Sequence, residues 1–352
     1  MPTVLWLQCV ILLVLCLLMA PSAVAQFFPG KVWRDVQGDS IQAHGGGILF
    51  YGNVYYWFGE DRTPDLYSAV SCYSSTNLVD WKREGAALWR RDLLKVNGHR
   101  PFVERPKVIY NPATKKFVMW MHLDQAGYRF SRAGIAVSDT PTGSFIFVKA
   151  IRPIADTNDF SASDPAAQSV YGGTFRDMNL FVDDDGKAYV FYSSAGNWTM
   201  YVVRLNAEFT GPETPCVENK TWARILTRQM REGPAPFKWR GQYFLITSAC
   251  TGWAPNAANY SSAGNILGPW RTFGNPCAGP GADKTFGSQS TFVLPIPGRR
   301  NDFIFMADKW NPDNLPDSRY VWLPFSMNAN GTFAIPWHDD GRSNLVEKPQ
   351  LP

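Results

Sequence analysis

The stretch Asn179-Leu-Phe-Val-Asp-Asp-Asp-Gly-Lys-Ala-Tyr-Val-Phe-Tyr192 predicts a β-hairpin, because an apolar run meets a tight turn and then a second, aromatic-rich run. Asp184, Asp185 and Gly186 suit that turn, since aspartate and glycine readily adopt the backbone angles that tight turns require. The same pattern occurs five times along the chain, in segments 45–58, 107–120, 179–192, 235–246 and 291–305. Hairpins repeated in this way are typical of a radial array of small sheets.

A polar side chain precedes or opens each of these hairpins. These five repeat-phased residues are His44, Glu104, Asp177, Glu232 and Gln289. They lie roughly 60 residues apart, which leaves room in each repeat for about four short strands, the size of a propeller blade. We therefore predict an all-β fold, a five-bladed β-propeller, with the five polar residues on one ring around the central axis. No long amphipathic helix and no linker is indicated, so we expect one domain.

The N-terminal segment has the pattern of a secretory signal peptide. Residues 1–25 contain no charged side chain, hold the apolar run 10–18 and end in the small-x-small sequence Ala23-Val-Ala25. A transmembrane anchor is the alternative, but the apolar run is short for a membrane span. We predict a signal peptide over 1–25, a single propeller domain over 26–352 and a secreted, extracellular protein that does not contact a membrane once the signal is removed.

The charge and the cysteines narrow the protein's class further. The net charge of +4 arises from 34 basic and 30 acidic residues without long blocks of one sign, which gives no support to a nucleic-acid partner. Four cysteines remain after signal removal, and we favour a Cys250–Cys277 disulfide, while Cys72 and Cys216 either pair or stay free. Four sequons predict a glycoprotein: Asn197, Asn219, Asn259 and Asn330. We expect a monomer without a cofactor.

Two of the repeat-phased residues are suited to glycosidic bond hydrolysis. That reaction needs an acid to protonate the leaving oxygen and usually a second carboxylate. Glu232 lies in Arg231-Glu-Gly-Pro-Ala-Pro236, where a strand enters the ring and the flanking glycine and proline favour a rigid, partly dry pocket. Asp177 starts the preceding repeat, and a neighbouring carboxylate raises the pKa of its partner. An isolated carboxylate at a strand start is more often a turn cap, but the repeat phasing favours the catalytic interpretation.

The segments Arg176-Asp-Met-Asn-Leu-Phe-Val-Asp-Asp-Asp-Gly186 and Glu232-Gly-Pro234 resemble glycoside hydrolase family 43, whose members are five-bladed propellers that invert the anomeric centre. The resemblance implies that Glu232 is the general acid and that Asp177 modulates its pKa and orients the substrate. The usual general base of the family is an aspartate in the first blade. This chain has Ile41-Gln-Ala-His-Gly-Gly-Gly-Ile-Leu49 there, without a carboxylate.

Three further segments resemble the branch of this family that contains exo-β-1,3-galactanases: Tyr55-Tyr-Trp-Phe-Gly-Glu60, Glu104-Arg-Pro-Lys107 and Phe286-Gly-Ser-Gln-Ser290. The resemblance implies that Gln289 positions the catalytic water. It also implies release of galactose from β-1,3-galactan of the arabinogalactan type or a related plant or algal polysaccharide. A neutral amide is a poor proton acceptor, so the identity of the base stays open.

The remaining site residues are expected to contact substrate. They are Glu60, Glu104, Tyr128, Asn197 and Thr251. Asn197 is also a sequon, and a glycan there would conflict with a place in the pocket. His44 has two interpretations, a ligand to a metal in the central channel or a hydrogen-bonded structural histidine. We favour the structural one and predict no metal, because the chain has only 4 histidines and no clustered ligands.

Two alternative functions stay open. An arabinofuranosidase or β-xylosidase would share the fold, but such enzymes usually keep the first-blade aspartate that this chain lacks. A catalytically inactive, glycan-binding propeller is favoured by the missing base and opposed by the presence of both Asp177 and Glu232.

Overall fold

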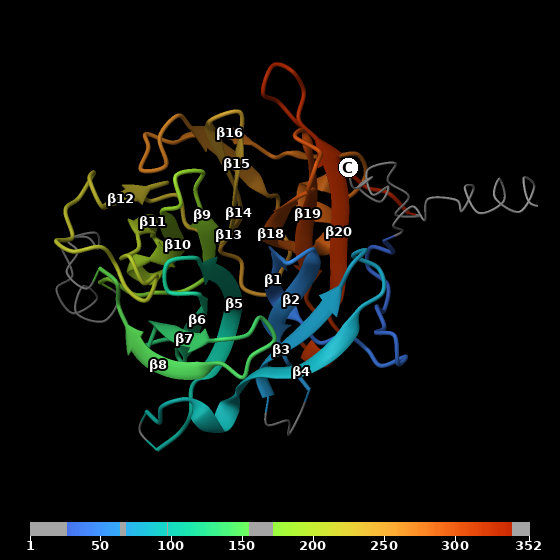
Figure 1. Ribbon diagram of the computed structural model, residues 1–352. Coiled ribbons are helices and arrows are strands. Elements are labelled where there is room, and N and C mark those ends of the chain that lie inside the picture. The colour runs from blue at the N-terminus through green and yellow to red at the C-terminus, as the bar shows by residue number, and fades with distance from the viewer. Residues whose placement is uncertain (1–26, 64–67, 97, 155–171, 340–352) are drawn as a thin grey trace, which may run out of the picture.

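In the computed structural model, which describes residues 27–63, 68–96, 98–154 and 172–339, the chain forms five small antiparallel sheets around one central axis (Figure 1). The predicted all-β, five-bladed β-propeller is therefore confirmed. Within these ranges the helices are short 3-10 turns, and none is long and apolar enough to cross a membrane. The predicted signal peptide, residues 1–25, lies outside the described residues, as do residues 340–352 at the end of the predicted domain 26–352.

Each blade runs along the sequence from an inner strand at the axis to an outer strand. Blade 1 contains β1 (His44–Tyr51), β2 (Val54–Glu60), β3 (Ser68–Ser75) and β4 (Lys82–Trp89), and blade 2 contains β5 (Phe102–Asn111), β6 (Lys116–Asp124), β7 (Arg132–Ser138) and β8 (Ile146–Ile151). Blade 3 contains β9 (Met178–Val182), β10 (Ala188–Ser194), β11 (Thr199–Arg204) and β12 (Trp222–Ile225), and blade 4 contains β13 (Arg231–Trp239), β14 (Gln242–Ala249), β15 (Asn259–Ala263) and β16 (Arg271–Gly274). Blade 5 has three strands, β18 (Gln289–Pro295), β19 (Asp302–Lys309) and β20 (Arg319–Ser326), and the short strands β17 (Cys277–Ala278) and β21 (Ile335–Pro336) pair with each other.

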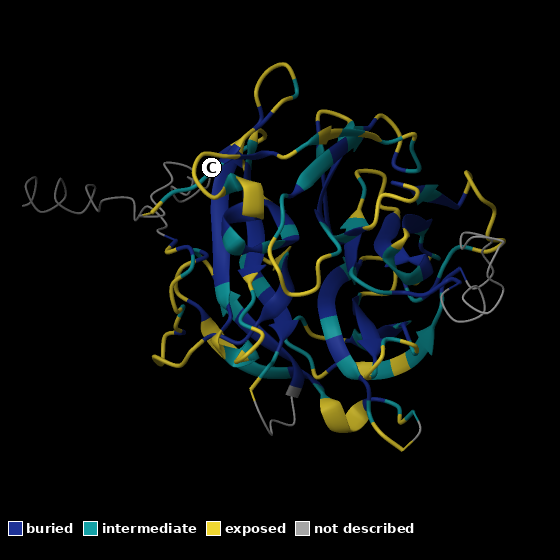
Figure 2. Ribbon diagram, turned by 180° about the vertical axis from the view of Figure 1, so that it is seen from behind, coloured by how far each residue is buried: buried dark blue, intermediate teal, exposed yellow. Residues whose placement is uncertain are grey.

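The hydrophobic core is divided into five clusters, one between each pair of neighbouring blades. Successive side chains of a strand point to opposite faces of its sheet, so one strand contributes to two clusters. In β2, for example, Trp57 packs toward blade 5 whereas the next residue, Phe58, packs toward blade 2. Figure 2 shows the result, with buried residues concentrated in the strands and exposed residues mainly in the loops.

The inner strands form a closed ring, in which β1 contacts β5, β5 contacts β9, β9 contacts β13, β13 contacts β18 and β18 contacts β1. The segment before β1 helps to join the first and last blades. Phe27 and Ile41 pack into the same cluster as Trp322, and the Gly30 N–H donates to the Tyr320 carbonyl at 2.8 Å. The Tyr320 hydroxyl also donates to the Ile41 carbonyl at 2.9 Å. Residues 27–43 thus pack against the three-stranded blade 5.

The repeat-phased polar residues lie at the starts of the inner strands, as the sequence predicts. In β1, β5 and β13 a β-bulge follows the polar residue, and the next residue adopts a left-handed backbone: Gly45 at φ 56°, Arg105 at φ 55° and Gly233 at φ 60°. A bulge bends its strand and redirects the side chain beside it. Glycine adopts this conformation without strain, whereas a residue with a Cβ, such as Arg105, does so at a cost of roughly 1–2 kcal/mol.

The predicted Cys250–Cys277 disulfide is wrong, because all four cysteines of the described chain are free thiols. Cys250 lies just after β14 and faces the cavity described below, whereas Cys277 belongs to β17 and packs in the core between blades 4 and 5. The two residues flank the same blade, but their side chains belong to different environments. Cys72 is likewise buried in a core cluster, and Cys216 is exposed.

Candidate active site

A cavity of ≈ 310 Å³ opens around the axis at the end where the inner strands begin. Four of the five repeat-phased residues line it: Glu104, Asp177, Glu232 and Gln289. His44 is fully buried and does not line the cavity. Its ring stacks on Tyr320, with centroids 5.0 Å apart, and its Nδ1 lies 3.5 Å from Asp308 Oδ1. Neither ring nitrogen has a hydrogen-bond partner among the described residues, which differs from the hydrogen-bonded histidine that the sequence analysis favours.

Glu232 has the environment of a general acid. Its Oε1 accepts a hydrogen bond from Gln289 Nε2 at 2.9 Å, and its Oε2 accepts one from Asn197 Nδ2 at 3.2 Å. Burial, and next the negative charge of Asp177, raise the pKa of Glu232 to about 8. The carboxyl group is therefore mainly protonated at neutral pH and can donate its proton to a leaving oxygen.

Asp177 supports this acid through both charge and backbone contacts. It lies directly before β9, and its Oδ2 accepts a hydrogen bond of 3.0 Å from the Gly233 N–H, in the bulge next to Glu232. The same oxygen lies 3.1 Å from Arg105 Nη2. Asp177 thus stays close to Glu232 while its own charge is compensated, which suits a residue that tunes the pKa of its neighbour.

The amide of Gln289 is hydrogen-bonded at both ends. Its nitrogen donates to Glu232 and to Ser248 Oγ, the latter at 3.0 Å, and its oxygen accepts from Trp310 Nε1 at 3.0 Å and from the Arg105 guanidinium. An inverting glycosidase keeps its acid and the group that activates water about 6.5–9.5 Å apart, so that sugar and water fit between them. For Gln289 to position water, substrate entry must therefore separate it from Glu232.

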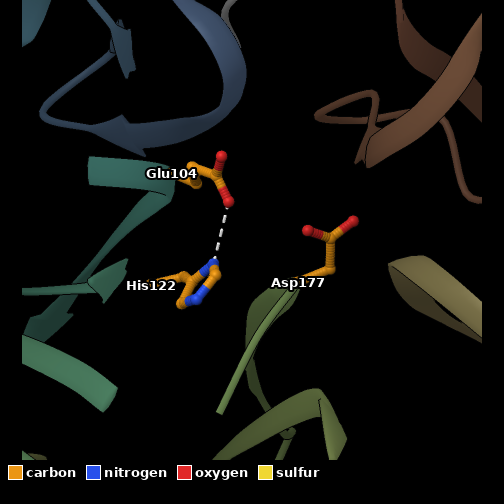
Figure 3. A group of neighbouring side chains, drawn as sticks. All are labelled: Glu104, His122 and Asp177. Carbon is orange, nitrogen blue, oxygen red and sulfur yellow. Dashed lines mark ion pairs between the residues drawn. The ribbon is translucent and has the colours of Figure 1, made fainter. Parts of the chain in front are cut away.

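Glu104 has the opposite environment to Glu232. His122 Nδ1 lies 2.9 Å from Glu104 Oε2 (Figure 3). Tyr128 donates its hydroxyl to Glu104 Oε1 at 2.9 Å. Burial opposes ionisation of Glu104, but the contacts with His122, Arg62 and Tyr128 outweigh it and lower the pKa to about 2. Glu104 is thus a carboxylate suited to accept hydrogen bonds from sugar hydroxyls.

The His122 imidazole is held between two carboxylates. Its Nε2 lies 2.9 Å from Asp124 Oδ2, on the side away from Glu104. Burial lowers its pKa, but the hydrogen bonds and charges of Asp124 and Glu104 raise it overall to about 9. His122 is therefore an imidazolium at neutral pH, hydrogen-bonded to Asp124 through Nε2 and ion-paired with Glu104 at Nδ1.

Glu104, His122 and Asp177 bring three metal-ligating atoms within 4.8 Å of one another (Figure 3). A cation would have to displace the proton of His122 and the Arg105 guanidinium that pairs with Asp177. These side chains therefore do not fit a metal site, although their spacing resembles one.

Sequence reasoning missed Arg105, which connects much of the site. Its Nη1 donates to the Ser290 carbonyl at 2.9 Å, its Nη2 contacts Asp177 and Gln289, and its backbone N–H donates to Glu60 Oε1 at 2.8 Å. One signal was available, since Arg105 occupies the position that Gly45 and Gly233 hold in their repeats. A non-glycine residue in that strained conformation indicates a functional reason to keep it.

The other predicted substrate contacts are placed as follows. Glu60 lines the cavity but is almost fully buried and pairs with Arg62, while Tyr128 lines it beside Glu104. Asn197 also lines it, and its Nδ2, the atom to which a glycan would be attached, donates to Glu232. Thr251 differs from the prediction, since it is exposed and outside the lining, and its hydroxyl donates to the Ala254 carbonyl within a turn.

Further lining residues were not predicted, and they come from loops and strand ends around the same cavity. They are Arg62, His122, Arg176, Cys250, Gly252, Trp253 and Trp310. Several are aromatic or cationic, and Trp253 is 45% exposed at the cavity, edge-on to Trp310.

A sequence profile of the family described as Glycosyl hydrolases family 43 matches residues 47–278, more than half of the chain. The chain belongs to glycoside hydrolase family 43. It is therefore a glycoside hydrolase, and the family resemblance stated from the motifs is confirmed.

Solved structures of the same family agree over almost the whole chain. A GH43 β-1,3-galactosidase solved with galactodeoxynojirimycin is 41% identical, with a TM-score of 0.79, covering 89% of this chain and 99% of that one. An exo-β-1,3-galactanase from Clostridium thermocellum is 33% identical, with a TM-score of 0.80, covering 92% of this chain and 67% of that one. The exo-β-1,3-galactanase of Phanerochaete chrysosporium, solved with β-1,3-galactotriose, is also 33% identical, with a TM-score of 0.76, over 91% and 68% of the two chains.

A more distant relative has a different activity. Arabinan endo-1,5-α-L-arabinosidase B from Emericella nidulans is 26% identical over 189 residues, which is 53% of this chain. The match spans 42% of that relative, less than half of its length. The chain is thus more similar to the solved β-1,3-galactosidase and exo-β-1,3-galactanases than to this arabinanase.

Proposed function

We propose that this glycoside hydrolase is a secreted, monomeric, inverting exo-β-1,3-galactanase that releases galactose from β-1,3-galactan backbones of the arabinogalactan type. The observation that carries the proposal is the pair formed by a protonated Glu232 and an adjacent Asp177, with the amide of Gln289 rather than a carboxylate across from them. The names of the structural neighbours, which are β-1,3-galactosidases and exo-β-1,3-galactanases, support the substrate class.

In this mechanism Glu232 protonates the glycosidic oxygen while Glu104 accepts hydrogen bonds from the sugar. Asp177 keeps Glu232 protonated, and Gln289 turns from Glu232 to hold the attacking water. The water oxygen bonds to the anomeric carbon as the bond to the leaving oxygen breaks, so no carboxylate nucleophile is needed and the anomeric configuration inverts. The proton that the attacking water loses passes to solvent, because the neutral amide of Gln289 is a poor proton acceptor.

The direct test is incubation of the purified protein with β-1,3-galactobiose, xylobiose and arabinobiose in parallel. We expect galactose from the first and no sugar from the other two. Activity on xylobiose or arabinobiose instead would favour the alternative function of a β-xylosidase or an arabinofuranosidase. Binding of β-1,3-galactan without release of sugar would favour the inactive glycan-binding propeller.

The stereochemistry is tested separately by proton NMR of the first product. Initial α-galactose from the β-linkage supports inversion, and initial β-galactose refutes it. Gln289→Ala should strongly reduce turnover and leave ligand binding largely intact, because the amide acts on water more than on sugar. If the variant instead loses binding and retains turnover, Gln289 is a substrate contact.

A further inference from the structure

Three guanidinium groups line the cavity, and they differ in how their charge is compensated. Arg62 pairs with Glu60 and lies 3.7 Å from Glu104, and Arg105 lies 3.1 Å from Asp177. Arg176 has no carboxylate partner within ion-pair distance in the described chain. Its Nη2 donates to the Tyr128 carbonyl at 3.1 Å, and its Nε is buried without a hydrogen-bond partner.

The surroundings of Arg176 add positive charge rather than remove it. Arg132 and Arg152 lie nearby, and neither forms an ion pair in the described part of the chain. Burial lowers the pKa of Arg152, and the charges of Arg132 and Arg176 lower it further, while the charge of Asp124 acts in the opposite direction.

The carboxylates closest to this arginine group are already engaged. Asp124 accepts hydrogen bonds from His122, Ser131 and the backbone N–H groups of Gln125 and Phe130. Asp177 faces Arg105, as described above. Among the residues that the structure describes, no carboxylate pairs with the Arg176 guanidinium at the cavity wall, and a neutral galactose unit does not require such a charge.

We propose that Arg176 binds an oxyanion on the glycan, so that the enzyme favours β-1,3-linked galactan units that carry a carboxylate or a sulfate ester. Guanidinium groups form short, often bidentate hydrogen bonds with such groups. The proposal rests on the proposed β-1,3-galactanase function and narrows its substrate class to anionic glycans.

A packing role is the rival explanation, because the Arg176 guanidinium also lies 5.2 Å from the centre of the Tyr128 ring. A residue that only positions Tyr128, and through it Glu104, would affect neutral and anionic substrates alike. The ratio between the two substrates therefore separates the explanations.

The experiment compares kcat/KM for neutral β-1,3-galactobiose with that for the same disaccharide carrying a 6-carboxylate or a 6-sulfate on either unit. We expect the wild-type protein to favour at least one anionic form. Arg176→Gln should lower kcat/KM for that form about 10–100-fold more than for the neutral one, the range expected for a hydrogen bond to a charged group. Arg176→Lys should retain part of the preference.

Arg132→Gln is the matched control, since it removes the same charge near the cavity from a residue that does not line it, and it should leave the ratio unchanged. If Arg176→Gln does not fold, inorganic sulfate serves as the probe on the wild type, where it should inhibit the anionic substrate competitively. Equal losses on both substrate types, no wild-type preference for any anionic form, or no sulfate competition would overturn the proposal. Absence of galactose release from the neutral disaccharide would instead overturn the proposed function.

Discussion

Glu104 and Glu232 occupy the same position in two different blades, at the start of the inner strand and just before a bulge. Glu104 contacts an imidazolium, a guanidinium and a phenol, and its pKa falls to about 2. Glu232 contacts amides and lies near a carboxylate, and its pKa rises to about 8. Two identical side chains thus have opposite protonation states at neutral pH.

The difference shows that the repeat provides the position and the neighbours provide the chemistry. Both glutamates are largely buried, and burial alone would raise both pKa values. What separates them is His122, which comes from β6 beside Glu104, whereas the nearest charge that raises the pKa of Glu232 is Asp177. An acid and a carboxylate on one ring are what glycosidic bond hydrolysis requires.

The largest expected effect comes from replacing Glu232, the protonated glutamate of the two. Glu232→Gln should fold normally and lose about 10²–10⁴-fold in kcat on β-1,3-galactobiose, because its leaving group needs a proton. An activated aryl galactoside should lose much less, since its leaving group departs without protonation. Steady-state kinetics on the two substrates provide the check, and equal losses would remove Glu232 from the role of acid.

The ionised state of Glu104 depends on His122, so the second variant replaces this imidazole. His122→Phe leaves the carboxylates of Glu104 and Asp124 buried without their shared cation, which should cost about 3–5 kcal/mol of unfolding free energy. His99→Phe is the control, because His99 is exposed and its replacement should change stability by less than about 0.5 kcal/mol. Denaturant unfolding measures both variants.

The difference in unfolding free energy between the wild type and His122→Phe should depend on pH in a defined direction. The pKa of His122 is raised in the folded protein, so its stabilisation is complete below the unfolded value of about 6.5 and disappears as pH rises through about 9. The stability gap between wild type and His122→Phe should therefore shrink from pH 6.5 to pH 10. A gap that stays constant over this interval would show that His122 is neutral in the folded protein.

The smallest effect is expected at Asp177. Asp177→Asn removes a negative charge near Glu232, so the pKa of Glu232 should fall and the basic limb of the pH–rate profile should move to lower pH. Burial is the larger cause of the raised pKa, so the limb should still lie well above the ordinary glutamate value of about 4.3. An unshifted basic limb, or a glycosyl intermediate trapped on Asp177, would contradict its role as a pKa modulator.

The features that repeat along the sequence were the ones that could be predicted. Hairpin turns and apolar alternation are local, so five blades and five inner-strand positions follow from the sequence alone. Four of the five polar residues line one cavity as expected, and His44 is the one that does not.

The features that depend on which side chains meet across strands could not be predicted. His122 lies inside the apolar run of β6, and Glu104 lies opposite it in β5 of the same blade, a pairing that depends on the register of the two strands. The Cys250–Cys277 pairing and the place of Thr251 failed for a related reason, because the direction of a side chain at a strand end depends on the turn that follows. Arg105 was missed because its backbone conformation is a property of the bulge and not of its residue type.

The most direct test of the account is a carbon-13 NMR titration of the glutamate carboxyl groups, with Glu232→Gln and Glu104→Gln used to assign the two signals. We expect Glu232 to titrate near pH 8 and Glu104 to stay ionised until the pH approaches about 2. If both signals titrate together near the ordinary value of about 4.3, the two environments do not differ and the assignment of acid and carboxylate is wrong.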